Sequence, residues 1–375
     1  MSKGKIGLIT YHAAYNFGSV LQAYATQYSI EKLGYEVEII DYRTPSQTLW
    51  YTKDVTLKKG KRSLIEAPFF LRIWGARKRR ARKFEAFISK KMNLTSKTLT
   101  HFEDFKDLSY TTLVSGSDQI WNYGCGEFRF EPWDAIRPYF LDFGKPQKRI
   151  AYASSFGIPT EKYVKQCAKY LEHYEFLSTR EPIGKNLIEK SIDTSVSLVA
   201  DPTWLLDKTK WSELLTDKQC TKPYILVYNL SLNWRHAGRW LKSVKNLADQ
   251  KGYSVYCISP LHPLIYPGVK MIDDAGPLDF LSLLKNAKLV VTNTFHGTIF
   301  SMNFEIPFIS LEVKPSSRQG QILEMCNLKN RIANSPSELT AFNNAYEMDF
   351  SYSTAKIKNL RNKSIDYLKD SLKND

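Results

Sequence analysis

The strongest chemical signal in the sequence is a His-Gly pair directly after an apolar run. Residues 289–300 read Leu-Val-Val-Thr-Asn-Thr-Phe-His-Gly-Thr-Ile-Phe, which predicts a buried strand, a short polar loop and a helix. His296 then stands at the helix N-terminus, where backbone N–H groups and the helix dipole favour a bound anion. A histidine also transfers protons near neutral pH. We therefore predict a catalytic role for His296, with a purely structural histidine as the alternative.

A second candidate is Arg180, in the segment Ser178-Thr179-Arg180-Glu181 that ends another predicted strand. Its guanidinium group is the best match in the sequence to a carboxylate or a phosphate. A lone arginine after a strand can equally be a surface charge, or be paired locally with an acid such as Glu181. The sequence leaves both interpretations open.

Two further loops carry many polar side chains. Residues 11–19 follow the first predicted strand and include His12, Asn16, Gly18 and Ser19. Gly18 allows backbone to approach a ligand, but the loop lacks both the Gly-x-Gly-x-x-Gly spacing of dinucleotide-binding proteins and the Gly-Lys-Ser/Thr of a P-loop. His12 can be a functional residue or a structural one.

The other polar loop, residues 115–122, reads Ser-Gly-Ser-Asp-Gln-Ile-Trp-Asn. Hydrogen-bonding groups around Trp121 would suit sugar recognition by stacking and hydroxyl contacts. The alternative is a capped turn in which Ser117 or Asp118 is a helix N-cap.

Short apolar runs alternate with helix-length patterns along the chain, which is typical of parallel βαβ architecture. The predicted strands are 5–10, 36–41, 112–115, 150–154, 176–178, 196–200, 224–229, 254–259, 269–272, 289–292 and 307–311. The predicted helices are 19–33, 160–174, 182–190, 235–249, 278–286, 298–303 and 354–372. Gly34 stands where the first helix should end. Because ligands bind beyond the carboxyl ends of parallel strands, the four polar loops should lie at such edges.

The length of 375 residues favours two domains. We predict an N-terminal Rossmann-like α/β domain over residues 1–210 and a second one over 211–345. Residues 346–375 should form a C-terminal helix that packs back on the first domain.

The net charge of +15 is concentrated in one segment. Residues 53–97 contain fifteen Lys and Arg against three acids, a local net of +12. Phe84, Phe87 and Ile88 follow its densest part at helical spacing, which predicts a basic amphipathic helix. Such a helix could contact a membrane surface or an anionic lipid-linked sugar, or simply be a solvated face docked by its phenylalanines. No motif indicates a nucleic-acid partner.

The sequence carries no recognisable leader, and no apolar run reaches the roughly 18 residues of a transmembrane helix. The five cysteines are scattered without metal-ligand spacing, which suits a reducing compartment and gives no indication of a metal site. We expect a cytoplasmic protein, peripheral to the inner face of the membrane if the basic helix binds lipid, and we expect no cofactor.

Several motifs, in this order, resemble the polysaccharide pyruvyl transferase family. They are Thr10-Tyr11-His12, residues 16–24 (Asn-Phe-Gly-Ser-Val-Leu-Gln-Ala-Tyr), Ile40-Asp41-Tyr42-Arg43, residues 116–122, residues 152–157 (Tyr-Ala-Ser-Ser-Phe-Gly), residues 178–181, Asp201-Pro202-Thr203 and residues 293–297. The resemblance spans roughly residues 5–335. It implies two Rossmann-like domains facing a cleft, similar to GT-B glycosyltransferases.

The resemblance also implies a reaction: transfer of a pyruvyl group from phosphoenolpyruvate to a sugar of a cell-surface or exopolysaccharide glycan, forming a pyruvyl ketal. His296 and Arg180 match positions expected near the donor, and Thr294, Gly297, Thr298 and Arg318 would help to bind it. The acceptor or cleft residues would be His12, Asn16, Gly18, Ser19, Ser117, Asp118, Gln119, Trp121 and Asn122. His296 would act as general acid/base or as phosphate stabiliser.

Two other functions remain compatible with the sequence. A nucleotide-sugar-dependent glycosyltransferase of the GT-B type would share the fold and the glycan acceptor. A non-catalytic, glycan-binding member of the family would keep the fold without the reaction.

Overall fold

The structure, a computed structural model, describes residues 5–52, 62–216, 222–230, 234–259, 266–342 and 344–373. Residues 53–61 of the basic segment, and Cys220, lie outside this range. The chain divides into two compact units. The first comprises Met1–Lys53, Glu85–Leu206 and Lys358–Asp375, and the second comprises Asp54–Phe84 and Asp207–Ile357. The change of unit after Leu206 lies close to the predicted boundary at residue 210, whereas the grouping of residues 54–84 with the second unit has no signal in the sequence.

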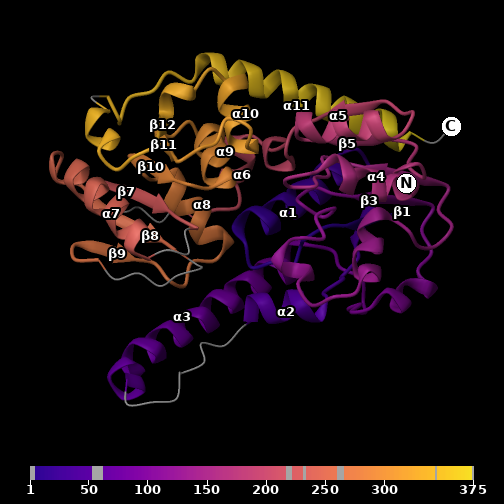
Figure 1. Ribbon diagram of the computed structural model, residues 1–375, viewed down its shortest axis with the longest axis horizontal. Coiled ribbons are helices and arrows are strands. Elements are labelled where there is room, and N and C mark those ends of the chain that lie inside the picture. The colour runs from indigo at the N-terminus through magenta and orange to yellow at the C-terminus, as the bar shows by residue number, and fades with distance from the viewer. Residues whose placement is uncertain are drawn as a thin grey trace. The chain divides into compact units, whose positions relative to one another are not determined.

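The first unit is built on parallel strands (Figure 1). Its strands are β1 (Lys5–Ile9), β2 (Glu36–Ile39), β3 (Thr112–Ser115), β4 (Lys148–Ala151), β5 (Leu177–Thr179) and β6 (Val196–Leu198). Its helices are α1 (Phe17–Lys32), α2 (Pro45–Thr52), α4 (Glu161–Leu171) and α5 (Pro182–Ser191), with 3-10 turns η1 (Phe102–Asp107), η2 (Gly126–Phe128), η3 (Trp133–Phe140) and η4 (Pro202–Trp204).

The main sheet of the first unit has the order β2-β1-β3-β4, and β5 pairs with β6. Isolated bridges from Ile150 to Phe176 and from Ser154 to Thr179 continue the parallel order toward β5. The chain adds β2 on one side of β1 and β3 on the other. The loops after β1 and β3 therefore flank a topological switch point, the usual ligand position in such sheets.

Helix α1 shows how the sequence defines its own ends. Asn16 is the N-cap, and its side-chain oxygen accepts a hydrogen bond from Gly18 N at 3.0 Å. Gly34 follows the helix with φ +93°, and its N–H donates to Glu31 O. This left-handed geometry is the termination that the sequence predicts at Gly34.

The second unit contains a six-stranded parallel sheet (Figure 1). Its strands are β7 (Tyr224–Tyr228), β8 (Ser254–Ile258), β9 (Val269–Met271), β10 (Leu289–Thr292), β11 (Phe308–Leu311) and β12 (Ile332–Ala333). Its helices are α6 (Lys208–Ser212), α7 (Trp234–Asp249), α8 (Pro277–Lys285), α9 (Phe295–Phe304) and α10 (Arg318–Met325), with 3-10 turns η5 (Lys329–Arg331) and η6 (Glu338–Ala341).

The strand order β12-β11-β10-β7-β8-β9 is that of a Rossmann-like sheet. The chain builds β8 and β9 outward from one side of β7 and then returns to place β10 on the other side. The switch point therefore lies between β7 and β10. Apolar residues of α7 at helical spacing, Ala237, Leu241 and Val244, are buried in one core with the strands.

Two long helices contain residues of both units. Helix α3 spans Arg62–Lys91 and includes the predicted amphipathic segment, with Phe84, Phe87 and Ile88 buried. Helix α11 spans Ser351–Leu372. Within the first unit, Ser364 Oγ of α11 accepts a hydrogen bond from Ala200 N at 2.8 Å, and Tyr367 donates to Ala151 O at 2.9 Å.

The predicted element types are confirmed, and the differences lie at their ends. Strand β4 ends at Ala151 rather than at residue 154, because Ala153 adopts φ +53° and leaves the extended conformation. Helix α9 begins at Phe295 rather than at residue 298, because Thr294 caps it. Helices α2, α6 and α10 and strand β12 lie where the sequence predicts no element.

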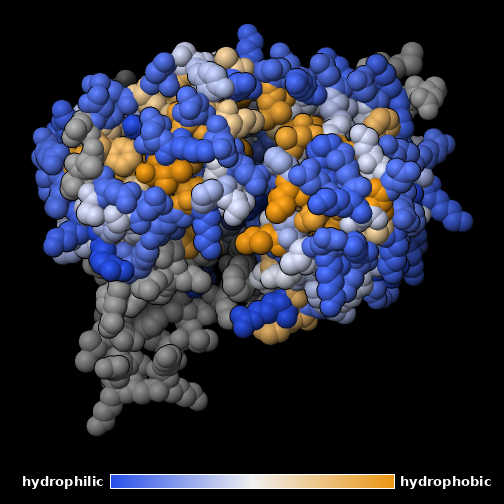
Figure 2. Space-filling view, turned by 45° about the horizontal axis from the view of Figure 1, so that its top comes forward, coloured by the Kyte–Doolittle hydropathy of each residue, from blue (hydrophilic) through white to orange (hydrophobic). Residues whose placement is uncertain are grey.

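Polar and charged side chains cover most of the face shown in Figure 2, and apolar residues appear there in separate groups. None of the helices in the described residues combines the length and hydropathy of a membrane-spanning segment.

Candidate functional site

The polar loops of the first unit meet at its switch point. Ser19 Oγ, at the start of α1, donates to Asp118 Oδ2 at 2.5 Å. Gln22 joins the two loops, since its amide donates to Thr10 Oγ1 at 2.8 Å and its carbonyl oxygen accepts from Ser117 N at 3.1 Å. The structure thus brings together the predicted residues Ser19, Ser117 and Asp118.

Arg180 is the centre of this cluster. Its guanidinium donates to Glu181 Oε1 at 3.0 Å, to Asp201 Oδ2 at 2.5 Å and to Asp118 Oδ1 at 3.3 Å. Only 2% of its side chain is exposed. Burial by itself lowers the pKa of Arg180, but the charges of Asp201, Glu181 and Asp118 outweigh it and raise that pKa.

The surroundings of Arg180 favour a role in holding loops together. Three carboxylates already surround the guanidinium, and their charge disfavours a further anion such as phosphoenolpyruvate. The local pairing with Glu181, the alternative left open by the sequence, is confirmed. Arg180 holds the loops after β3, β5 and β6 together.

His12 is fully buried, and its Nε2 lies 2.8 Å from Asp41 Oδ1. Asp41 also accepts hydrogen bonds from Arg43 Nε at 2.6 Å and from Thr98 Oγ1 at 2.7 Å. Burial alone would raise the pKa of Asp41. The hydrogen bonds to Asp41 and the charge of His12 lower it by more, so the pKa of Asp41 lies well below its usual range. His12 therefore anchors the end of β2 to the loop after β1.

Trp121 is not a sugar-stacking surface, and that prediction is wrong. Its ring is fully buried and stacks on Phe140 at a centroid distance of 5.6 Å, and its Nε1 donates to Tyr139 O at 3.0 Å. Gln119 and Asn122 are half-buried, and their side-chain amides hydrogen-bond to each other at 3.3 Å. Trp121 is part of the aromatic core because the loop turns inward after β3.

In the second unit, the His-Gly loop lies at the carboxyl end of β10. Thr294 is the N-cap of α9, and its Oγ1 accepts from Gly297 N at 2.8 Å. A Cβ on Gly297 would lie 2.4 Å from Thr292 Oγ1 and 2.6 Å from Thr294 Oγ1, so only glycine fits this close approach of helix and strand. His296 is half-buried in the first turn.

Arg318 approaches the same loop from the next helix. It is the first residue of α10, which follows β11, and its guanidinium lies 5.2 Å from the centroid of the Phe295 ring. The Phe295 and His296 rings are 5.1 Å apart. Gln319 fixes α10 to α9 by donating to Thr298 Oγ1 at 2.7 Å. The predicted donor residues Thr294, His296, Gly297, Thr298 and Arg318 therefore belong to one locality.

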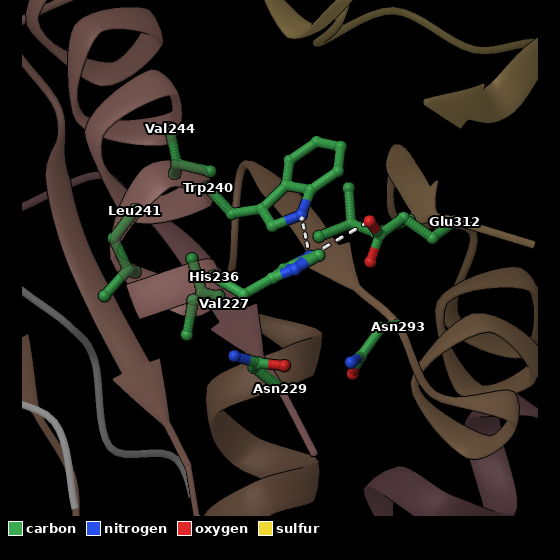
Figure 3. Close-up of a pocket in the computed structure, with 10 residues that line it drawn as sticks. Val227, Asn229, His236, Trp240, Leu241, Val244, Asn293 and Glu312 are labelled. Atoms are coloured by element: carbon green, nitrogen blue, oxygen red, sulfur yellow. Dashed lines mark hydrogen bonds and ion pairs between the residues drawn. The ribbon is translucent and has the colours of Figure 1, made fainter. Parts of the chain in front are cut away.

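The loops after β7, β10 and β11 and helix α7 line a pocket, and the sequence did not single out several of its residues (Figure 3). Its polar lining consists of Asn229 after β7, Asn293 after β10, Glu312 after β11, and His236 and Trp240 on α7. Its apolar lining is Val227, Ala237, Leu241, Val244 and Leu311. Glu312 directly follows the predicted strand 307–311, and Asn229 ends the predicted strand 224–229, so the positional rule that selects His296 would have found them.

Among the described residues, no group of three His, Cys, Asp or Glu side chains is arranged to hold a metal ion. Burial raises the pKa of the Cys125, Cys167, Cys257 and Cys326 thiols to about 12, so these cysteines are poor nucleophiles.

Several solved structures are similar to this chain. UDP-GlcNAc 2-epimerase from Neisseria meningitidis, bound to UDP-GlcNAc, has a TM-score of 0.51 at 11% identity over 97% of this chain and 99% of that chain. A UDP-N-acetylglucosamine 2-epimerase from Listeria monocytogenes has a TM-score of 0.48 at 10% identity, covering 98% and 91%. The calicheamicin glycosyltransferase has a TM-score of 0.45 at 12% identity, covering 98% and 96%. The first of these likenesses confirms the predicted fold, two Rossmann-like units of the GT-B type.

No curated protein matches the sequence. The sequence profile described as polysaccharide pyruvyl transferase matches residues 16–315, most of the chain. The chain belongs to the polysaccharide pyruvyl transferase family.

Proposed function

We propose that this protein transfers a pyruvyl group from phosphoenolpyruvate to a sugar of a cell-surface or exopolysaccharide glycan, forming a pyruvyl ketal. The observation that supports this most directly is the convergence of His296 and Arg318 at the N-termini of two adjacent helices. A helix N-terminus favours an anion, and a guanidinium forks onto a carboxylate or phosphate. Phosphoenolpyruvate carries both groups.

The reaction needs one proton at the donor and two bonds from the acceptor. Protonation of the enol methylene carbon makes the central carbon electrophilic, and one sugar hydroxyl attacks it. A second hydroxyl then attacks the same carbon, and the phosphate leaves. The two hydroxyls release two protons: one replaces the proton taken up by the methylene carbon, and the other leaves with the phosphate. His296 is the general acid/base for these transfers or the stabiliser of the departing phosphate.

A pH profile separates the two roles of His296. If His296 is the general acid/base, the variant His296→Gln would lose the limb of the kcat–pH profile that its titration produces in the wild type. A phosphate-stabilising role would leave the shape of the profile and lower kcat at all pH values.

The residues of the first unit have other roles in this proposal. Arg180, His12 and Trp121 hold the loops in place, and the half-buried Gln119 and Asn122 hydrogen-bond to each other. Arg180 is therefore a positioning residue.

Calorimetry with phosphoenolpyruvate tests the donor assignment. We expect saturable binding by the wild type and about tenfold weaker binding by Arg318→Gln, since a hydrogen bond to a charged group is lost. Lys288→Gln is the matched control, because this exposed lysine lies just before β10, at the opposite edge of the sheet from His296. Binding of UDP or a nucleotide sugar in place of phosphoenolpyruvate would replace the proposal with a glycosyltransferase. A chain that binds glycan but neither donor would be a non-catalytic member.

We further propose that the protein is cytoplasmic and contacts the membrane where a lipid-linked acceptor resides. Trp74 on α3 is 41% exposed, and the Lys78 ammonium lies 3.6 Å from its ring centroid. Arg82, one turn further along, is also exposed. Arg79 and Lys83 are instead paired with Asp274 and Asp279, which favours the solvated-face alternative for that part of the helix.

Vesicle sedimentation tests the membrane contact. Each basic residue near an anionic surface contributes about 1 kcal/mol, so Lys78→Glu with Arg82→Glu should reduce binding to vesicles of phosphatidylcholine and phosphatidylglycerol by more than about 20-fold. Equal binding by the variant, or by neutral vesicles, would contradict the contact.

A further inference from the structure

The pocket beside β7 and β10 contains a hydrogen-bond conflict at His236. Its Nε2 accepts from Trp240 Nε1 at 3.0 Å and lies 2.9 Å from Glu312 Oε1, as the dashed lines in Figure 3 show. A ring nitrogen that accepts from the indole N–H has no proton for the carboxylate, and one that carries a proton cannot accept from the indole. His236 Nε2 therefore satisfies only one of its two neighbours at a time.

A hydroxyl group resolves this conflict. When Nε2 accepts from Trp240, the Glu312 carboxylate, whose side chain is 42% exposed, is open to another donor, and a ligand O–H fits that position. The oxygen of the same hydroxyl can accept from a side-chain amide, and the amides of Asn229 and Asn293 line the same pocket (Figure 3). A group that both donates and accepts fits this lining better than a pure donor or a pure acceptor.

The charge and the size of the pocket restrict the class of ligand further. The carboxylate of Glu312 disfavours an anion, so the pocket is unsuited to phosphoenolpyruvate. The enclosed space is about 10 Å³, which accommodates one hydroxyl-sized group. Glu312 is also a non-glycine residue with φ +53°, an unfavourable conformation of the kind that gathers at ligand sites. These features describe an uncharged ligand that inserts one hydroxyl into the pocket.

We propose that this pocket binds a neutral sugar ring through its hydroxyls, with Glu312 and His236 as the principal contacts. Asn293 precedes His296 by three residues in one loop, so the sugar site and the donor site share a loop within the second unit. The sugar is the acceptor glycan if the proposed function holds, and this identification rests on that function. The ribose of a nucleotide offers the same chemistry and is the second source to be distinguished.

Saturation-transfer NMR on the full chain tests the site. The probes are methyl β-D-glucopyranoside, methyl β-D-galactopyranoside and uridine, with tetrahydropyran as a ring that carries no hydroxyl. We expect transfer to at least one hydroxylated probe and none to the tetrahydropyran. Glu312→Ala should weaken that binding about tenfold or more, because it removes a hydrogen bond to a charged group.

Two variants control the result. Glu324→Ala removes an exposed carboxylate of α10, paired with Lys329, from the same unit, and should change nothing. Glu312→Gln keeps the side-chain shape and should weaken binding less than Glu312→Ala. A glycoside signal identifies a glycan site and a uridine signal a nucleotide site. No transfer to any hydroxylated probe, or equal transfer in Glu312→Ala, would overturn the proposal.

The same samples separate this inference from the proposed function. Glu312→Ala should keep the phosphoenolpyruvate affinity of the wild type, because the carboxylate is assigned to the sugar site. If phosphoenolpyruvate does not bind while sugars bind through Glu312, the donor assignment fails and the sugar site stands. If phosphoenolpyruvate binds and sugars do not, the reverse holds.

Discussion

Replacing Arg180 by methionine should destabilise the first unit strongly, and more at neutral than at acid pH. The substitution keeps a long straight side chain but leaves the buried carboxylates of Asp118, Glu181 and Asp201 without their shared cation. An unpaired buried carboxylate is forced to take up a proton. For an aspartate with an unfolded pKa near 3.9, that protonation costs about 1.36 kcal/mol per pH unit above 3.9, hence about 4 kcal/mol at pH 7.

This magnitude agrees with the roughly 3–5 kcal/mol measured when one partner of a buried ion pair is removed. At about pH 5 the same protonation costs only about 1.5 kcal/mol. The sign follows from linkage: in the variant the folded-state pKa of the carboxyl is raised, so the penalty applies above the unfolded pKa and disappears as pH falls through it. The loss of stability should therefore shrink by more than half between about pH 7 and pH 5.

Urea unfolding at the two pH values measures this loss. Arg129→Met is the control, because this exposed arginine lies over the largely exposed ring of Phe130, 5.5 Å from its centroid, and its removal should cost less than about 0.5 kcal/mol. The reasoning is refuted if Arg180→Met loses less than about 1 kcal/mol, or if the loss does not diminish at acid pH. Loss of phosphoenolpyruvate binding without loss of stability would show instead that Arg180 holds the donor.

Two further predictions concern local geometry and acid stability. Gly297→Ala should destabilise the second unit by about 1–3 kcal/mol in urea unfolding, because the added Cβ would overlap Thr292 and Thr294. Gly238→Ala in α7 is the control: nothing lies within 4 Å of the added Cβ, so it should be neutral or stabilise by up to about 1 kcal/mol. Equal effects at both sites would contradict the close approach at Gly297. Because the pKa of Asp41 is lowered in the fold, its ionisation stabilises the protein above its unfolded pKa and that stability is lost as pH falls. Asp41→Asn should therefore unfold more easily at about pH 7 by roughly 1–3 kcal/mol, with a smaller difference at about pH 3, and a constant difference would count against the lowered pKa.

The sequence predicted the position of His296 in the fold because the signal there is local. A strand, a capped loop and a glycine that permits close approach are adjacent in the chain, so the position of His296 follows from the elements on either side. Asn229 and Glu312 obey the same rule, but a single polar residue after a strand is too common to be selected without its neighbours in space.

Trp121 shows where sequence reasoning failed, and His12 shows what it left open. Each lies in a polar loop after a strand, the same context as His296, yet each is fully buried. A loop beyond a strand can turn outward to a ligand or fold back over the core, and local sequence does not distinguish these directions.

By itself, the sequence determined the element types, their order and the family, because hydrophobic periodicity and turn residues act over a few positions along the chain. Tertiary structure alone decided which charged groups meet. Arg180 contacts Asp118 and Asp201, which are far from it in sequence, and His236 contacts Glu312 from a different element. The physical reason is that charge pairing depends on distance in space, which the order of parallel strands sets and the residues themselves do not encode locally.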